Sequence, residues 1–305
     1  MTTKSNPEQV TPGSLKPKKR GIRAFLTHQT LRRVSQIGVA SFITYLIIRN
    51  AIVGENSGVS TTSPEAYCPF GGLETLYKYI TTSTSFISHT HLSNVVMLIA
   101  VLVVALLFRS AFCGWLCPLG FLQDLVSKFS GFLQKRIPGL RRGISSLKKK
   151  GARLAVLDRY LRYLKYLVLA WAVGGAAVFG FMVFKDFDPW SALISIAEFS
   201  FTPGLIVLII TLVASFFIER PWCRYACPLG AASGLLGKLS PTYLKRDADV
   251  CTSCKICTKT CPMGLKIHDV SSVKSVDCVT CLECVDACPV NGALEVKIGL
   301  PLIGK

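Results

Sequence analysis

Two stretches of the sequence, FCGWLCPLGFLQDLVSKFS at 112–130 and WCRYACPLGAASGLLGKLS at 222–240, are near copies of each other. Eight residues are identical at a constant offset of 110 positions, and each copy follows an apolar run. Each contains the pattern Cys-x3-Cys-Pro, which we call the CxxxCP motif. A chain that repeats one cysteine motif after two apolar segments is built from two related halves. The cysteines of the two motifs are Cys113, Cys117, Cys223 and Cys227.

The overall composition is that of a membrane protein with basic loops. Half of the 305 residues are hydrophobic and the mean hydropathy is +0.46, yet the formal net charge is +18. Soluble domains seldom combine these properties. The chain also contains 13 cysteines, so their spacing has to be explained.

Four apolar segments approach the length needed to cross a membrane as a helix, which is about 20 residues. They are Val34–Val53, Leu92–Phe108, Leu164–Phe184 and Pro203–Ile218. A soluble chain of 305 residues could hardly bury four such helices. We therefore expect a membrane all-α part with four transmembrane helices, arranged as two parallel helix-pair repeats.

The distribution of basic residues predicts the orientation of these segments. Lys and Arg number 8 in residues 1–33, 13 in 109–165 and 11 in 219–305, against 3 elsewhere. By the positive-inside rule, both termini and the central loop are cytoplasmic, in a multi-pass protein of a prokaryotic cell (inner) membrane. The basic loops are expected to contact anionic membrane lipid, and nucleic-acid binding is not expected.

Residues 251–262 read CTSCKICTKTCP and residues 278–289 read CVTCLECVDACP. Both follow the spacing by which bacterial ferredoxins hold two [4Fe–4S] clusters, with the fourth cysteine of each block ligating the other cluster. Zinc is the alternative metal for four thiolates, but two complete blocks with equally placed prolines favour clusters. The expected ligands are Cys251, Cys254, Cys257 and Cys288 for the first cluster, and Cys278, Cys281, Cys284 and Cys261 for the second.

The CxxxCP cysteines lie where the returning helices are expected to reach the cytoplasm, beside the ferredoxin blocks. Cysteines four residues apart share one face of a helix, so pseudo-symmetry would bring all four thiols together. They could ligate a third cluster, bind copper or zinc, or cycle as dithiols. Burial as small apolar side chains is the structural alternative. Leu125 and Phe129 follow at helical spacing, which suits a helix lying in the membrane interface.

A weaker similarity links YCPFGGLETL at 67–76 with FDPWSALISI at 187–196, and places Cys68 opposite Asp188 in two outer loops. Asp188 could accept a proton from a quinol or hydrogen-bond to it, and Cys68 could be a redox or ligand partner. Two turn-initiating segments, with a buried thiol and a capping carboxylate, are the alternative. No expected span contains the paired histidines of a cytochrome b-type haem.

These patterns divide the chain into five parts. They are a basic cytoplasmic segment (1–33), membrane repeat 1 (34–130), a basic linker (131–163), membrane repeat 2 (164–240) and a small α+β two-[4Fe–4S] ferredoxin domain (241–305).

Taken in this order, the four spans, the two CxxxCP motifs and the paired ferredoxin blocks resemble the membrane-bound polyferredoxins of the NapH and NosR type. The resemblance implies an electron-transfer subunit, rather than a stand-alone enzyme, that connects cytoplasmic clusters with a quinone pool or a partner reductase. The alternative is a maturation, redox-sensing or metal-delivery factor for a partner metalloenzyme. Only 33 residues precede the first expected span, so no outer flavin-binding domain of the NosR kind is expected.

Overall fold

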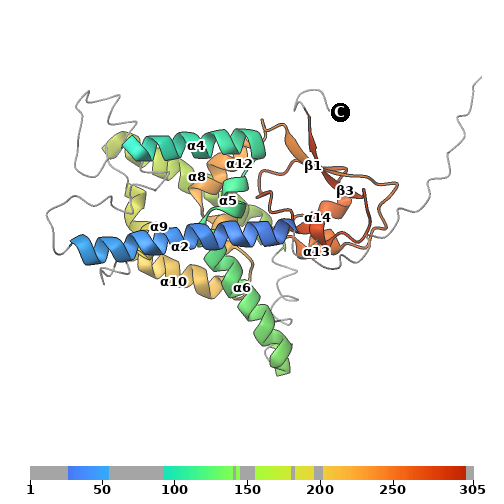
Figure 1. Ribbon diagram of the computed structural model, residues 1–305, viewed down its shortest axis with the longest axis horizontal. Coiled ribbons are helices and arrows are strands. Elements are labelled where there is room, and N and C mark those ends of the chain that lie inside the picture. Colours follow the sequence, from blue (N-terminus) through green and yellow to red (C-terminus); the bar gives the residue numbers. More distant parts are fainter. Residues whose placement is uncertain are drawn as a thin grey trace, which may run out of the picture.

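The computed structural model describes residues 27–54, 92–139, 142–144, 155–179, 183–195 and 202–299. Within these ranges, long helices gather at one end of the molecule and a small domain with a β-sheet lies at the other (Figure 1). The long helices are α2 (His28–Gly54), α4 (Leu92–Phe108), α8 (Ala155–Phe179) and α10 (Pro203–Ser215).

The long helices match the expected spans to different degrees. The span expected at Leu92–Phe108 coincides with α4. Helix α8 begins nine residues before the expected third span, inside the region predicted as a basic linker, and ends before Phe184. The early start has a physical reason: Asp158 and Arg162 form ion pairs along and beyond this helix, so its polar first turns are stabilised by contacts outside the apolar segment.

One helix among the described residues, His28–Arg49, is long and apolar enough to cross a membrane, and two shorter helices, Asn94–Phe108 and Pro203–Ser215, are also apolar. Their outer faces are apolar as well, since Val96 and Ile206 are each more than 60% exposed. These features agree with a membrane location, whereas the four-span arrangement stays an expectation.

The first CxxxCP motif is divided between two helices. Cys113 lies in α5 (Ala111–Trp115), whereas Cys117 has extended backbone angles (φ −66°, ψ 115°) and directly precedes α6 (Pro118–Arg136). The prediction that both cysteines share the face of one continuous helix is therefore wrong. The cause is Pro118, because a proline disfavours the helical conformation in the residue before it and is itself well suited to the first position of a helix.

The second motif repeats this break. Cys223 lies in α11 (Pro221–Tyr225), and Cys227 (φ −71°, ψ 113°) precedes α12 (Pro228–Leu236). The two halves therefore share a helix–extended cysteine–helix unit. They differ in the length of the second helix, because α6 has 19 residues and projects away from the other helices, whereas α12 has nine (Figure 1).

A left-handed turn precedes each of these units. Arg109 (φ 61°) and Arg220 (φ 50°) are the turning residues, and both are buried. Non-glycine residues seldom adopt positive φ, so surrounding contacts must hold these turns. Arg109 donates hydrogen bonds to the carbonyl oxygens of Val273 and Ser275 in the small domain.

The segment between α8 and α10 folds back into the helical part. It contains the short helices η2 (Val183–Phe187) and α9 (Pro189–Ser195), both of which pack against α10. Gly204 of α10 makes this possible, since a Cβ there would lie 3.0 Å from the carbonyl oxygens of Asp186 and Asp188. The Asp188 turn is thereby held against the amino-terminal end of α10.

The small domain is built on a three-stranded antiparallel sheet in the order β2–β1–β3, with Leu244 of β1 paired to Val273 of β2 and Val296 of β3. Short helices connect the strands and carry the cysteine blocks. The elements are β1 (Thr242–Arg246), α13 (Ile256–Thr260), η4 (Ile267–Asp269), β2 (Ser272–Val273), α14 (Glu283–Ala287) and β3 (Leu294–Ile298). This is the α+β domain expected from the sequence.

The small domain is docked closely against the CxxxCP units. Gly114 of α5 and Gly234 of α12 lie so near it that a Cβ would overlap the carbonyl oxygens of Val279 and Val276, respectively. Trp115 also donates from its indole nitrogen to the carbonyl of Thr280 at 3.0 Å. Both halves of the chain therefore use a glycine at the point where the cysteine blocks approach.

Candidate iron–sulfur and redox site

The second cysteine block surrounds a small cavity within the small domain. Three of its cysteines are buried, and the fourth cysteine at the cavity wall comes from the first block. The cysteines that line the cavity are Cys261, Cys278, Cys281 and Cys284. This is the set that the sequence predicted for the second cluster, so the residues present fit such a group.

The remaining four cysteines lie at the outer side of the domain. Cys254 is exposed, and Cys257 is partly buried. Burial raises the pKa of the Cys257 thiol, and the neighbouring thiols of Cys251 and Cys288 raise it further, whereas hydrogen bonds from Thr258 lower it. Cys288 of the second block therefore lies beside the first block, as the crossed ligand pattern requires.

Both blocks hold their loops in the same unusual backbone conformation. Ser253 and Lys255 in the first block, and Thr280 and Leu282 in the second, all have positive φ between 49° and 60°. Alternating right- and left-handed residues turn successive backbone N–H groups into a concavity that favours negative charge, a feature of many iron–sulfur sites. Among the described residues, no three His, Cys, Asp or Glu side chains converge closely enough for a single metal ion.

Backbone N–H groups also point at individual thiols. Burial raises the pKa of Cys261, and the amides of Leu265, Met263 and Gly264 oppose this shift. Such donors stabilise a thiolate, which is the form that binds iron.

Three of the CxxxCP thiols, Cys113, Cys223 and Cys227, line one small cavity, and Cys117 lines a larger cavity together with Cys227. Burial raises the pKa of Cys113 and of Cys117 to about 11 and that of Cys223 to about 12, and a neighbouring thiol of the group adds to each shift. The pKa of Cys227 is raised well above its usual value by burial and then by the other three thiols. Because the motifs are broken between helices, the thiols meet through the pseudo-symmetry of the halves rather than along one helical face.

Two buried cations accompany these thiols. Lys165 of α8 is 1% exposed, forms an ion pair with Asp277, and lines a cavity together with Cys113 and Cys223. Arg220 is fully buried and donates to the carbonyl of Cys113 at 2.9 Å. The sequence analysis did not single out either residue. For both residues, the only signal in the sequence was a positive charge close to a cysteine motif or at the edge of an apolar segment.

Arg220 belongs to a buried network that also holds the cysteine blocks. Its guanidinium contacts Asp124 of α6 at 2.7 Å through two nitrogens, and the opposing charge of Asp124 raises the pKa of Arg220 despite burial. Arg32 of α2, 2% exposed, also pairs with Asp124 and reaches Glu283 of the second block at 3.3 Å. Arg32 further donates to the carbonyl of Gly114 at 2.9 Å. One network therefore joins α2, both CxxxCP units and the small domain.

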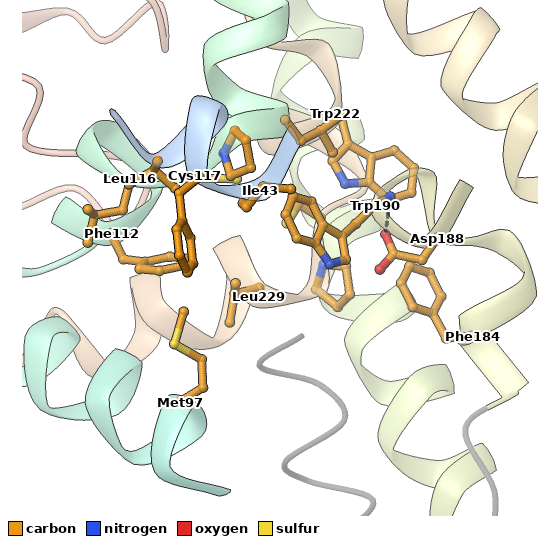
Figure 2. Close-up of a pocket in the computed structure, with 16 residues that line it drawn as sticks. Ile43, Met97, Phe112, Leu116, Cys117, Phe184, Asp188, Trp190, Trp222 and Leu229 are labelled. Carbon is orange, nitrogen blue, oxygen red and sulfur yellow. Dashed lines mark hydrogen bonds between the residues drawn. The ribbon is translucent and has the colours of Figure 1, made fainter. Parts of the chain in front are cut away.

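A larger, almost entirely apolar cavity of about 270 Å³ lies on the other side of the CxxxCP thiols. Figure 2 shows Phe112, Leu116 and Cys117 toward one end of it, and Phe184, Asp188, Trp190 and Trp222 toward the other. Cys227 lines both this cavity and the smaller one beside Cys113. The two cavities therefore share Cys227 as a common wall residue.

Two polar groups face this apolar space. Burial raises the pKa of Asp188 to about 7, although its carboxylate accepts a hydrogen bond from the backbone N–H of Trp190 at 3.2 Å. The indole nitrogen of Trp190 is buried and has no hydrogen-bond partner within the part of the chain that the structure describes. A buried donor without an acceptor is costly, so this indole is ready to bind a ligand oxygen.

The sequence analysis placed Asp188 in an outer loop, apart from the CxxxCP motifs. In the structure, Asp188 lines the same cavity as Cys117 and Cys227, because η2 and α9 fold back beside α10. Cys68, the residue expected opposite Asp188, lies outside the described residues.

The thiol sites form a continuous series. Cys113 packs in one buried cluster with Met263, Val279 and Cys281, so this CxxxCP cysteine packs directly against the second ferredoxin block. From the exposed Cys254 the series runs through the second block and the CxxxCP thiols to the apolar cavity.

Two family models match the chain. One, described as a 4Fe-4S binding domain, matches residues 90–138 and 200–246, which contain the two CxxxCP motifs. The other, described as a 4Fe-4S dicluster domain, matches residues 243–289 and covers the paired ferredoxin blocks. Both regions of the chain thus match family models that are described by 4Fe-4S binding.

Several characterised or named proteins are similar. "Putative electron transport protein YccM" of Escherichia coli is 33% identical over 79% of this chain and 65% of its own length. "Ferredoxin-type protein NapH" of Haemophilus influenzae is 31% identical over 54% of this chain and 51% of its own length. "Regulatory protein NosR" of Pseudomonas aeruginosa is 29% identical over 50% of this chain and 20% of its own length. The chain thus spans less than two thirds of the length of these relatives, and no solved structure matches it.

Proposed function

Because the chain is a 4Fe–4S polyferredoxin of the NapH and NosR type, an iron–sulfur electron-transport family, we propose that it passes electrons between cytoplasmic clusters and a quinone in the apolar cavity. The observation that carries this proposal is the position of Cys227, which lines both the cavity beside the other CxxxCP thiols and the apolar cavity with Asp188. Electrons would therefore not have to cross the bilayer thickness to reach a quinone.

The proposed ligands in the small domain are the two crossed sets of four cysteines. The first set is Cys251, Cys254, Cys257 and Cys288, and the second is Cys261, Cys278, Cys281 and Cys284. When bound, [4Fe–4S] clusters take up and release one electron at a time. The loops with positive φ and the amides directed at Cys261 favour the thiolate forms that such ligation needs.

At the CxxxCP thiols we propose a third iron–sulfur cluster. Support comes from the match of a 4Fe-4S binding domain to both motif regions and from the proximity of the four thiols. Lys165 and Arg220 would offset part of the negative charge of four thiolates in a buried site. Their own carboxylate partners, Asp277 and Asp124, fix where these cations lie.

The apolar cavity suits the ring of a quinone. Apolar side chains dominate its wall, and two polar groups in an apolar pocket commonly fix the orientation of a ligand. The indole N–H of Trp190 would donate to a quinone oxygen, and Asp188, with its pKa near 7, would accept a proton from a quinol or return one. Oxidation of a quinol releases two electrons and two protons, so a proton acceptor at the cavity is needed.

The proposed setting is a multi-pass membrane protein with both termini in the cytoplasm. The exposed apolar faces of α4 and α10 support it, as do the basic residues that cluster near the small domain. In this setting the ferredoxin domain would exchange electrons with a soluble partner or a partner reductase.

The test is quinol-dependent cluster reduction in proteoliposomes. The Asp188→Asn variant should lower the rate by about 100-fold or more, a typical loss on removing an acid–base group. Trp190→Phe removes one hydrogen-bond donor and should lower the rate by up to about tenfold. Chemical reduction by dithionite should stay unchanged in both variants. Asp186→Asn, an exposed carboxylate two residues away, is the matched control. The wild-type rate of quinol oxidation should rise with pH through about 7, as Asp188 loses its proton, and this rise should vanish in Asp188→Asn.

A second candidate function is a redox-sensing or maturation factor, favoured by the similarity to a protein named as regulatory. Clusters that are indifferent to quinol, combined with loss of metal in Cys223→Ser, would support this second function and overturn the first.

A further inference from the structure

The two ferredoxin blocks carry opposite charges. Residues 250–268, which contain the first block, include three lysines and no acidic residue. Residues 278–290, which contain the second block, include Glu283 and Asp286 and no lysine or arginine. The two copies of one cysteine motif therefore differ in charge: the first is positive and the second is negative.

In the second block the acidic residues are used to dock another element. Asp286 of α14 accepts hydrogen bonds from the backbone N–H of Gln29 at 3.1 Å and contacts Nδ1 of His28 at 2.9 Å. Glu283, one turn earlier, pairs with Arg32. The face of α14 is thus the surface through which this block binds the basic start of α2.

The corresponding face of the first block is open. The blocks correspond at an offset of 27 residues, so Lys259 occupies the position of Asp286 and Ile256 that of Glu283. Both are exposed, as are Cys254 and Lys255. Lys255 and Lys259 form no ion pair with any residue in the described ranges.

We propose that this open face of α13 docks the acidic face of a soluble one-electron carrier protein. The inference rests on the proposed function and names the class of its cytoplasmic partner. Three features support it: the charge is complementary to an acidic surface, the exposed Ile256 supplies an apolar contact within a charged rim, and Cys254 brings a cluster ligand to the surface. The second block shows how the same helix face docks through charges of the opposite sign.

The exchange itself is simple. The reduced carrier loses one electron and the first cluster gains it, or the reverse, and no bond is formed or broken. Lys255 and Lys259 would act by steering and orienting the acidic carrier, so their effect should decrease with ionic strength.

The experiment uses the full-length, cluster-containing protein in detergent, with a plant-type [2Fe–2S] ferredoxin as the acidic probe. Stopped-flow measurement of electron exchange at low salt should show a second-order rate about tenfold lower in the Lys255→Glu/Lys259→Glu variant than in the wild type. A basic probe, cytochrome c, should react faster with the variant. The Kd of the ferredoxin, measured by calorimetry, should weaken in parallel.

Two matched variants control for net charge and for side-chain shape. Lys135→Glu/Lys238→Glu changes the charge equally at exposed positions outside the small domain, and Lys255→Arg/Lys259→Arg retains the positive face. Both should keep rates close to wild type. Equal losses in Lys135→Glu/Lys238→Glu, or an unchanged rate in Lys255→Glu/Lys259→Glu, would overturn the proposal.

Two further readouts separate the possible failures. If Lys255→Glu/Lys259→Glu instead weakened binding to phosphatidylglycerol vesicles and left ferredoxin exchange intact, the lysines would serve a lipid surface and the inference would be wrong. Dithionite-driven reduction of a quinone by the same variant tests the proposed function separately, because it bypasses the docking face.

Discussion

The two ferredoxin blocks share their cysteine spacing, their left-handed loop residues and a five-residue helix, yet the protein places them in opposite surroundings. The second block has three buried cysteines, packs against Cys113 and is tied to α2 through acidic side chains. The first has an exposed cysteine, and its Lys255 and Lys259 form no ion pair with another described residue.

The difference shows that the shared cysteine spacing gives both blocks the same loop and helix, whereas the residues between the cysteines determine what each block packs against. Glu283 and Asp286 hold the second block against the start of α2. Lys255 and Lys259 are exposed on the first block, at the face where the proposed carrier would dock.

The comparison predicts that equivalent cysteine substitutions have unequal consequences. Cys281→Ser should remove one cluster, or about four irons, and also stop electron flow to the CxxxCP thiols, because this residue packs beside Cys113. Cys254→Ser should also remove about four irons, but reduction of the remaining centres by dithionite should continue. Iron content and EPR spectra during titration check both variants. Unaltered spectra in Cys254→Ser would contradict the ligand assignment.

The buried network that holds the second block should be the next most sensitive feature. Asp124→Asn leaves Arg32 and Arg220 without their shared carboxylate, so the free energy of unfolding should fall by about 3–5 kcal/mol. Denaturation in mild detergent measures the loss. Asp249→Asn, at an exposed site, should change stability little, and a similar loss in both variants would argue against the network.

The close approach of α5 to the second block depends on Gly114. Gly114→Ala should separate α5 from the second block, since the added methyl would overlap the carbonyl oxygen of Val279. We expect a loss of a few kcal/mol, typical of overpacking at about 1–3 kcal/mol. Gly131→Ala, on α6 with open space around it, should instead stabilise the helix by up to about 1 kcal/mol. Equal stability of the two variants would show that the approach is looser than described.

The exposed edge of the α14 contact should matter least. The His28 ring is about half exposed in its pair with Asp286, and exposed ion pairs contribute about 0.2–1 kcal/mol. His28→Ala should therefore lower the free energy of unfolding by less than about 1 kcal/mol. A larger loss of unfolding free energy, measured as for Asp124→Asn, would contradict this. It would mean that the second block is held mainly by the exposed His28–Asp286 pair rather than by the buried Arg32.

Much of this architecture follows from local sequence patterns. The expected span at Leu92–Phe108 coincides with α4, because its residues from 95 to 108 are all apolar and of helical length. The α+β small domain follows from the two cysteine blocks, whose spacing is tied to one type of loop. The helix break at Cys117 could also have been predicted, because Pro118 follows it directly.

Other features depend on residues far apart in the sequence. Arg32, Asp124 and Arg220 look like isolated charges at the ends of apolar segments, and only the folded chain shows that they meet. The return of Asp188 to the cavity of Cys117 and Cys227 depends on Gly204, whose small size is informative only once its neighbours are known. The positions of these residues are therefore determined by tertiary contacts, which local sequence patterns do not predict.

The central claim is a continuous series of iron–sulfur centres from the first block to the apolar cavity. Iron and sulfide content of the purified protein, measured together with EPR during a redox titration, tests it most directly. The account predicts about twelve irons per chain, falling to about eight in Cys223→Ser. About eight irons in the wild type, unchanged by Cys223→Ser, would leave the CxxxCP thiols without a cluster and contradict the series.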